Sequence, residues 1–144
     1  MLKGINPLLS PEVLHILCSM GHRHDLAIVD ANFACDRDGP RIARLDGIAA
    51  TDVLDAVLSV LPLERKNPQA CWRMIANGSP ENDMPIFGSF RTVISRHEGP
   101  GLELFALPSA DFKDRVRNAF AVIVTGERRL YGNVIVRKGV VHAE

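Results

Sequence analysis

The sequence has 144 residues, 47% of them hydrophobic, and its 17 Lys and Arg balance its 17 Asp and Glu. A chain of this length is most simply one domain, residues 1–144, and can bury roughly two-thirds of its unfolded surface. It has no basic excess of the kind that binds nucleic acid. No run reaches the ~20 apolar residues that span a bilayer. We therefore expect neither a nucleic-acid nor a membrane partner.

Cysteine usage and the first residues indicate the compartment. Cys18, Cys35 and Cys71 are odd in number and far apart, without a Cys-x-x-Cys motif. This favours reduced thiols over a disulfide framework. Residues 1–4 lack the long apolar core of a signal peptide. We expect a cytoplasmic protein, and the zero net charge beside much apolar sequence hints that partner subunits cover part of its surface.

Helix and strand patterns alternate along the chain. Apolar residues at helical spacing predict helices over 11–20, 51–61, 86–98 and 109–119. Short apolar or alternating runs predict strands over 26–29, 41–46, 71–76, 102–107, 121–124 and 134–136. This alternation is typical of an α/β fold, a single layered domain with a central, largely parallel or mixed sheet flanked by helices.

Loops and helix ends are marked by their residue types. Gly21 is expected to end the first helix in a left-handed conformation, and Ser109 could cap the helix that follows it. Polar residues, Gly and Pro predict loops over 32–40 and 77–85, and a polar link over 64–69.

The first candidate site lies around the strand Leu26–Val29. This continuous apolar run is typical of a buried parallel strand, and ligands of open α/β sheets bind beyond the carboxyl ends of such strands. Asp30 could therefore bind a ligand hydroxyl, orient a histidine or cap the next turn. His22 enters the strand from its other end, and imidazole is suited to proton transfer near neutral pH. Whether His22 meets Asp30 depends on how loops and neighbouring subunits fold back.

A metal site is the second possibility at this strand. His22 and His24 alternate along the chain, as two ligands of one metal could. No other His, Cys or Asp cluster has a matching spacing, so two loop histidines are the simpler interpretation. A phosphate loop and a nucleophile elbow are absent as well. We expect no metal at this strand.

Two turn segments follow the most apolar strand. In Thr125-Gly126-Glu127 we expect a turn with Glu127 in solvent. Tyr131 and Asn133 flank a glycine, and tyrosine hydroxyls and asparagine amides bind polyhydroxylated ligands. A turn with a half-buried ring explains the same residues equally well.

Several of these motifs occur together in one known family. They are Met1-Leu2-Lys3-Gly4-Ile5, Pro7-Leu8, Ser10-Pro11-Glu12, Met20-Gly21-His22, Asp30-Ala31-Asn32-Phe33, Arg44-Leu45-Asp46-Gly47, Thr125-Gly126-Glu127-Arg128, Tyr131-Gly132-Asn133 and the ending from Val134 to Gly139. The ordered set spans essentially the whole chain. It resembles the ribose pyranase/fucose mutarotase (RbsD/FucU) family, and is closer to the fucose branch.

The resemblance implies an RbsD-like fold and an isomerase that interconverts anomers or ring forms of a free monosaccharide without metal or cofactor. It also implies a ring-shaped homo-oligomer, typically a decamer, with sites near the subunit contacts. His22 matches the family's acid–base histidine, and Asp30 matches its ligand-binding aspartate. Tyr131, Gly132 and Asn133 match the segment that closes the sugar site.

Ser109 departs from the family pattern, which has a sugar-contacting Arg or His at this position. A serine hydroxyl is short and neutral, so it cannot hold two sugar oxygens as an Arg fork can. The stretch 64–100 matches least and could reshape the pocket. We expect a mutarotase for L-fucose or a related aldose. A sugar-binding or transport-accessory protein without turnover is the alternative, and a metal-dependent hydrolase built on His22 and His24 is a third.

Overall fold

The computed structural model describes residues 1–35, 39–67 and 69–143. It contains α1 (Pro11–Ser19), β1 (Asp25–Val29), β2 (Arg41–Leu45), α2 (Ala50–Leu58), β3 (Cys71–Met74), α3 (Pro85–Glu98), β4 (Leu104–Leu107), α4 (Ser109–Arg117), β5 (Ala121–Thr125) and β6 (Val134–Arg137). These elements confirm the predicted alternation, with ends that differ by a few residues. Within the described ranges, no helix is long and apolar enough to cross a membrane.

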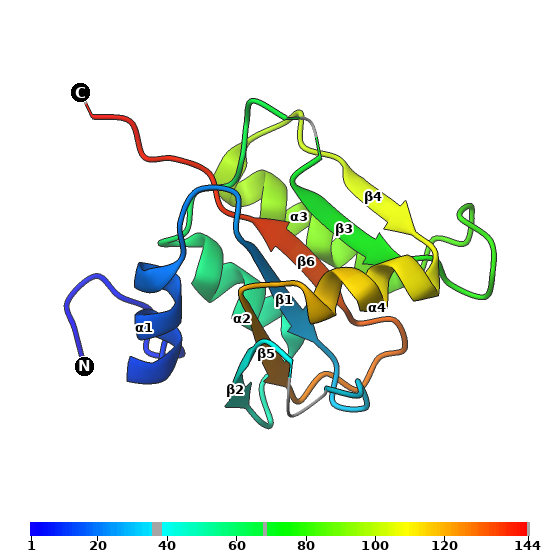
Figure 1. Cartoon of the computed structure of the whole chain (residues 1–144), viewed down its shortest axis with the longest axis horizontal. Coiled ribbons are helices and arrows are strands. Elements are labelled where there is room, and N and C mark those ends of the chain that lie inside the picture. Colours follow the sequence, from blue (N-terminus) through cyan, green and yellow to red (C-terminus); the bar gives the residue numbers. More distant parts are fainter. Residues whose placement is uncertain (36–38, 68, 144) are drawn as a thin grey trace.

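The strands form one mixed sheet in the order β2-β5-β1-β6-β3-β4 (Figure 1). β1 is parallel to β5 and antiparallel to β6, and β3 is antiparallel to β6 and parallel to β4. Because β2 is parallel to β5, every strand except β6 ends at the same edge, which we call the carboxyl edge. The α/β class with a mixed central sheet is therefore confirmed.

Helices cover both faces of the sheet unequally. Helices α1, α2 and α3 pack on one face around a large core that includes Ile16, Leu54 and Phe90. Helix α4 alone covers the central part of the other face, where Phe112 and Val116 meet the second side of β1, β3 and β5. Figure 1 shows α4 in front of the sheet, with α2 and α3 behind it. Strands buried on both faces explain why β1 and β5 are continuously apolar.

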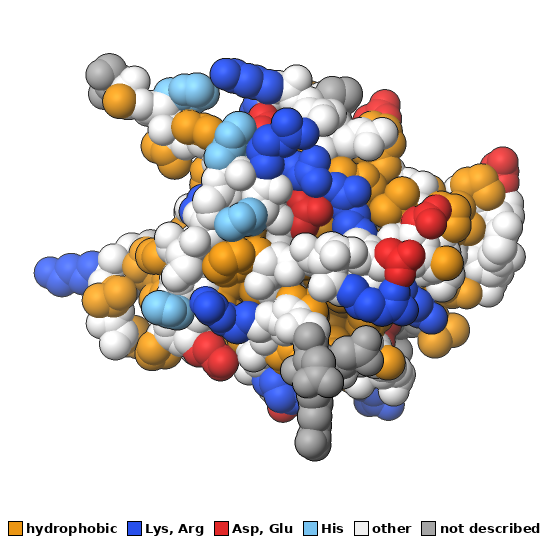
Figure 2. All heavy atoms as spheres, viewed as in Figure 1, with side chains coloured by type: hydrophobic (Ala, Val, Ile, Leu, Met, Phe, Trp, Pro, Cys, Tyr) orange, Lys and Arg blue, Asp and Glu red, His pale blue; other side chains and the backbone are white. Residues whose placement is uncertain are grey.

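Helix α4 is also tied to the sheet by charge. The Arg115 guanidinium carbon lies 3.5 Å from the centre of the Trp72 ring, and its Nε lies 3.0 Å from Asp25 Oδ2. Arg137 donates from Nε to Asp25 Oδ1 at 2.8 Å. Figure 2 shows basic side chains gathered on this face of the molecule.

Two predicted helix ends are wrong. Met20, the residue after helix α1, has an extended backbone, so the chain has left the helix before Gly21. Gly21 is not left-handed, and its N–H donates to the ring of His24 at 2.9 Å. Ser109 does not cap α4: the N-cap is Pro108, without a side-chain cap bond. The extended backbone of Pro108 starts the helix one residue earlier, so Ser109 is already helical.

The predicted loops correspond to irregular chain in the described parts. Residues 36–38 of the loop 32–40 and residue 68 of the link 64–69 lie outside the described residues. The polar link also contains a buried carboxylate, because Glu64 is only 4% exposed.

Candidate functional site

The carboxyl edge brings together the ends of β1 and β5 and the start of β6. Thr125 ties the first two, since its hydroxyl donates to the Val29 carbonyl at 2.8 Å. The Ala31 N–H donates to the Glu127 carbonyl at 3.0 Å. These bonds fix the position of Asp30, which directly follows β1.

Asp30 and Asn133 hold each other through two hydrogen bonds. The Asn133 amide donates to Asp30 Oδ2 at 2.7 Å, and the Asp30 N–H donates to Asn133 Oδ1 at 2.8 Å. The other carboxylate oxygen accepts from the Asn32 N–H at 2.9 Å. Asn133 is 3% exposed. Since each carboxylate oxygen has a further lone pair, Asp30 can still accept a hydrogen bond from a ligand hydroxyl.

Tyr131 is held by a residue that the sequence analysis did not single out. Its hydroxyl donates to Asn77 Oδ1 at 3.1 Å and accepts from the Asn77 N–H at 3.0 Å. Both residues have left-handed backbones, with φ of 61° for Tyr131 and 50° for Asn77. Non-glycine residues rarely adopt this conformation unless the surroundings impose it. The loop after β3 therefore takes part in positioning Tyr131.

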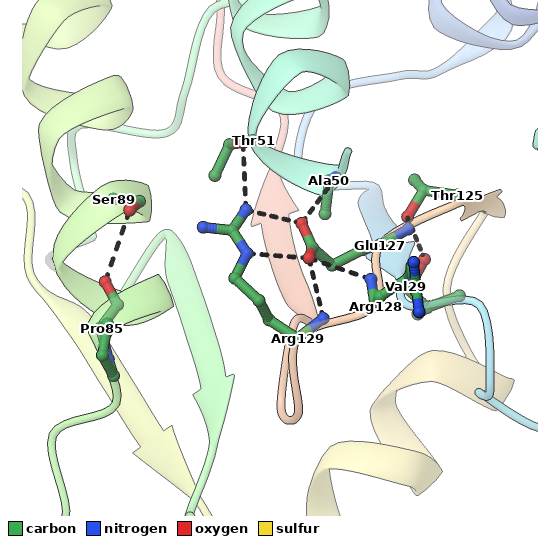
Figure 3. A network of polar contacts seen from close by, with 9 residues as sticks. All are labelled: Val29, Ala50, Thr51, Pro85, Ser89, Thr125, Glu127, Arg128 and Arg129. Carbon is green, nitrogen blue, oxygen red and sulfur yellow. Dashed lines mark hydrogen bonds and ion pairs between the residues drawn. The ribbon is translucent and has the colours of Figure 1, made fainter. Parts of the chain in front are cut away.

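The turn before Tyr131 is built on Glu127, and the expectation that this carboxylate lies in solvent is wrong. Glu127 is 4% exposed. It accepts from the Arg129 guanidinium at 2.8 and 2.7 Å and from the Ala50 N–H at the start of α2 (Figure 3). The Arg129 side chain, above all, lowers the pKa of Glu127 to about 2. A charged Glu127 thus joins this turn to α2.

Gly132 is required by close approach. A Cβ at this position would lie 2.5 Å from Glu127 Cγ and 3.0 Å from the Arg129 carbonyl oxygen. A side chain there would push the turn away from Glu127. The Tyr131-Gly132-Asn133 segment therefore needs a glycine at its centre to keep its place against Glu127.

A pocket of about 510 Å³ opens beside these residues, between the carboxyl edge and α4. Asp30, Tyr131 and Asn133 line it on the sheet side, and Lys113 and Arg117 line it from α4. Ligand sites at this edge are the rule in open α/β sheets, and a concave apolar cavity with a few convergent polar groups is typical of small-molecule sites.

His22 lies at the opposite edge of the sheet. Its Nε2 is 2.5 Å from Glu64 Oε2, and its side chain is 45% exposed. Glu64 also accepts from the Arg65 and Lys66 N–H groups, both at 2.8 Å. The Lys66 N–H, followed by His22, lowers the pKa of Glu64. The idea that Asp30 orients this histidine is wrong within one chain, because Glu64 does so.

The remaining candidates, His24 and Ser109, belong neither to the carboxyl-edge pocket nor to the His22–Glu64 pair. His24 stacks on Phe120, with ring centres 4.8 Å apart. Among the residues that the structure describes, no three His, Cys, Asp or Glu side chains gather as metal ligands. Ser109 is exposed at the start of α4 and does not line the pocket, whereas Lys113, one turn further along the helix, does.

The fold and the carboxyl-edge pocket together define an α/β protein with a candidate small-molecule site. A sequence model of the RbsD / FucU transport protein family matches residues 3–141. The chain therefore belongs to this family, which confirms the resemblance seen in its motifs.

Solved structures of similar proteins agree with this assignment. The protein Atu2016, described as a candidate sugar-binding protein, is 33% identical with a TM-score of 0.93, over 99% of this chain and 97% of that one. FucU from Bifidobacterium longum is 33% identical with a TM-score of 0.90, over 97% of this chain and 100% of that one. The fucose mutarotase from Streptococcus pneumoniae, solved in complex with L-fucose, is 32% identical with a TM-score of 0.89, over 98% and 100%. The family thus includes a sugar mutarotase.

Proposed function

We propose that this protein is a monosaccharide mutarotase, a cofactor-independent isomerase that interconverts the anomers of a free aldose, L-fucose or a related sugar. The observation that carries the proposal is the Asp30–Asn133 pair, fixed by two hydrogen bonds inside the carboxyl-edge pocket. A carboxylate and an amide are suited to sugar hydroxyls, and the similar protein from Streptococcus pneumoniae is a fucose mutarotase.

The reaction needs only proton transfer. A base removes the proton from the anomeric hydroxyl while an acid protonates the ring oxygen; the C1–O bond breaks, an aldehyde forms, and ring closure on its other face reverses both transfers. Asp30, Gly132 and Asn133 hold the sugar, with Tyr131 against the ring. His22 exchanges the proton, and a positioned group of this kind contributes about 10²–10⁴-fold.

His22 and Asp30 of one chain cannot meet on one sugar. They lie at opposite ends of β1, whose five residues span roughly 15 Å. The complete site therefore needs a second copy of the chain, whose His22 reaches the pocket of the first. We propose a ring-shaped homo-oligomer, a decamer with sites at its subunit contacts, that acts in the cytoplasm.

Saturation-transfer NMR on a panel of free sugars tests this function. L-Fucose, D-ribose, D-galactose and D-arabinose are incubated with the wild-type protein, His22→Ala and the control His15→Ala, which changes an exposed histidine of α1. We expect faster anomer exchange of at least one sugar, preserved in His15→Ala and reduced at least ~10-fold in His22→Ala.

The same panel separates the second candidate function. The similarity to a candidate sugar-binding protein and the neutral Ser109 both favour a sugar-binding or transport-accessory protein without turnover. That function predicts sugar binding with no acceleration of exchange for any sugar. Wild-type exchange rates in His22→Ala would instead remove His22 from the mechanism.

A further inference from the structure

Among the residues that the structure describes, one anionic and two cationic side chains line the carboxyl-edge pocket. They are Asp30, Lys113 and Arg117. The Asp30 carboxylate is satisfied by two neutral donors, the Asn133 amide at 2.7 Å and the Asn32 N–H at 2.9 Å. In the described part of the chain, neither Lys113 nor Arg117 forms an ion pair with Asp30. The positive charge on α4 is therefore not there to neutralise Asp30.

Lys113 and Arg117 differ in their surroundings. Arg117 forms an ion pair with Asp114 on its own helix. Lys113 forms no hydrogen bond or ion pair with any residue that the structure describes. The two lie four residues apart, so both project from the same side of the helix. Lys113 thus brings an ammonium without a described partner to the pocket wall.

We propose that the pocket takes a monosaccharide that carries a negative charge, a carboxylate or a phosphate ester, and that Lys113 binds this anionic group. An ammonium donates three hydrogen bonds and accepts none, and its bonds to an anion are about twice as strong as those between neutral groups. Repulsion from the Asp30 carboxylate directs the anionic group toward α4. The proposal rests on the proposed function, because it names the substrate class of the same site.

The placement of Ser109 agrees with this assignment. Ser109 begins α4, is exposed, and lies outside the pocket lining. Lys113 follows it by one helical turn and lines the pocket. Figure 2 shows Lys and Arg side chains, with Asp and Glu side chains beside them, on the face that carries α4. The pocket wall is therefore cationic at Lys113, whereas Ser109 adds no charge to it.

Matched pairs of sugars test the proposal. Anomer exchange is measured by NMR for D-glucose, D-glucuronate and D-glucose 6-phosphate, and for D-galactose and D-galacturonate, at low ionic strength. We expect at least one charged sugar to exchange ~10-fold more efficiently than its neutral counterpart, and the ratio of charged to neutral rates to fall ~10-fold in Lys113→Met. The control Lys3→Met removes an exposed lysine outside the pocket, and should keep the wild-type ratio.

Each outcome decides the proposal. A preference for uronates identifies a carboxylate, and a preference for the 6-phosphate identifies a phosphate ester. Equal rates for charged and neutral sugars, or an unchanged ratio in Lys113→Met, overturn it while the mutarotase function stands. If no sugar exchanges faster, the mutarotase function fails, and calorimetry then measures whether the pocket binds a charged sugar. Binding of a charged sugar that weakens in Lys113→Met supports the anionic pocket, and failure to bind any charged sugar overturns it.

Discussion

The His22 imidazole is joined to a buried carboxylate, with 2.5 Å between His22 Nε2 and Glu64 Oε2. Glu64 cannot turn away easily, because its other oxygen accepts two backbone N–H groups. This arrangement fixes the ring and favours a proton on Nε2. The other nitrogen, Nδ1, has no hydrogen-bond partner among the described residues and is the atom left for proton exchange on a half-exposed side chain.

The first prediction concerns Glu64 as the residue that positions His22. Glu64→Gln should lower anomer exchange at least ~10-fold, because the ring loses its orientation and the imidazolium loses its stabilising charge. The loss should fall on kcat with little change in KM for the sugar, because the carboxyl-edge pocket stays intact, whereas a general structural defect would affect both. The control Glu12→Gln changes an exposed carboxylate of α1. An unchanged rate in Glu64→Gln would contradict this role.

The second prediction concerns Asn77 as a positioning residue for Tyr131. Asn77→Gly removes the side chain that accepts from the Tyr131 hydroxyl but tolerates the left-handed backbone. One lost hydrogen bond is worth about 1 kcal/mol, so KM for the sugar should rise about fivefold with little change in kcat. Asn67→Gly makes the same change in a loop outside the pocket lining. A KM as low as that of the control would show that Asn77 does not act through Tyr131.

The third prediction concerns the pH dependence of stability through Glu127. Its pKa is held at about 2, against 4.5 as its ordinary value. A depressed folded-state pKa stabilises the fold above pH ~4.5, and this contribution is lost as the pH falls toward ~2. In urea unfolding, Glu127→Gln should be less stable than wild type by about 1–3 kcal/mol at neutral pH. The difference in the free energy of unfolding between wild type and Glu127→Gln should narrow as the pH falls from 4.5 to 3. A difference that is independent of pH would contradict a charged Glu127 paired with Arg129.

The fourth prediction compares two glycines. Gly132→Ala should destabilise the protein by about 1–3 kcal/mol, because the new methyl would meet Glu127 and the Arg129 carbonyl. Gly88, inside α3, has open space where its Cβ would lie, so Gly88→Ala should stabilise by about 0.5–1 kcal/mol. Urea unfolding measures both, and equal effects of the two substitutions would exclude the close approach at Gly132.

The fold was predictable because its signals are local. Buried on both faces, β1 and β5 carry apolar residues without interruption, and this pattern separates them from the amphipathic helices. The position of Asp30 at the carboxyl edge follows from the same pattern. The end of α1 was not predictable, since Met20 leaves the helix in an extended conformation and the Gly21 N–H donates to the ring of His24.

The partners within the site were not predictable, because they are distant in sequence. Glu64 lies 42 residues from His22, and Asn77 lies 54 residues from Tyr131. Nothing in the local pattern around Glu64 or Asn77 differs from an ordinary polar loop. For Glu127 a weak signal existed: Arg129 two residues later is a ready partner for a buried carboxylate.

Complementation between two inactive variants tests the central claim most directly. His22→Ala keeps the pocket, and Asp30→Ala keeps the His22–Glu64 pair. Each variant alone should exchange anomers at least ~10-fold more slowly than wild type, whereas co-assembled mixtures should regain part of the wild-type rate, because some sites combine an intact pocket with an intact histidine. Size-exclusion with light scattering confirms that mixed oligomers form. Mixed oligomers without any restored exchange would contradict a mutarotase site shared between two copies of the chain.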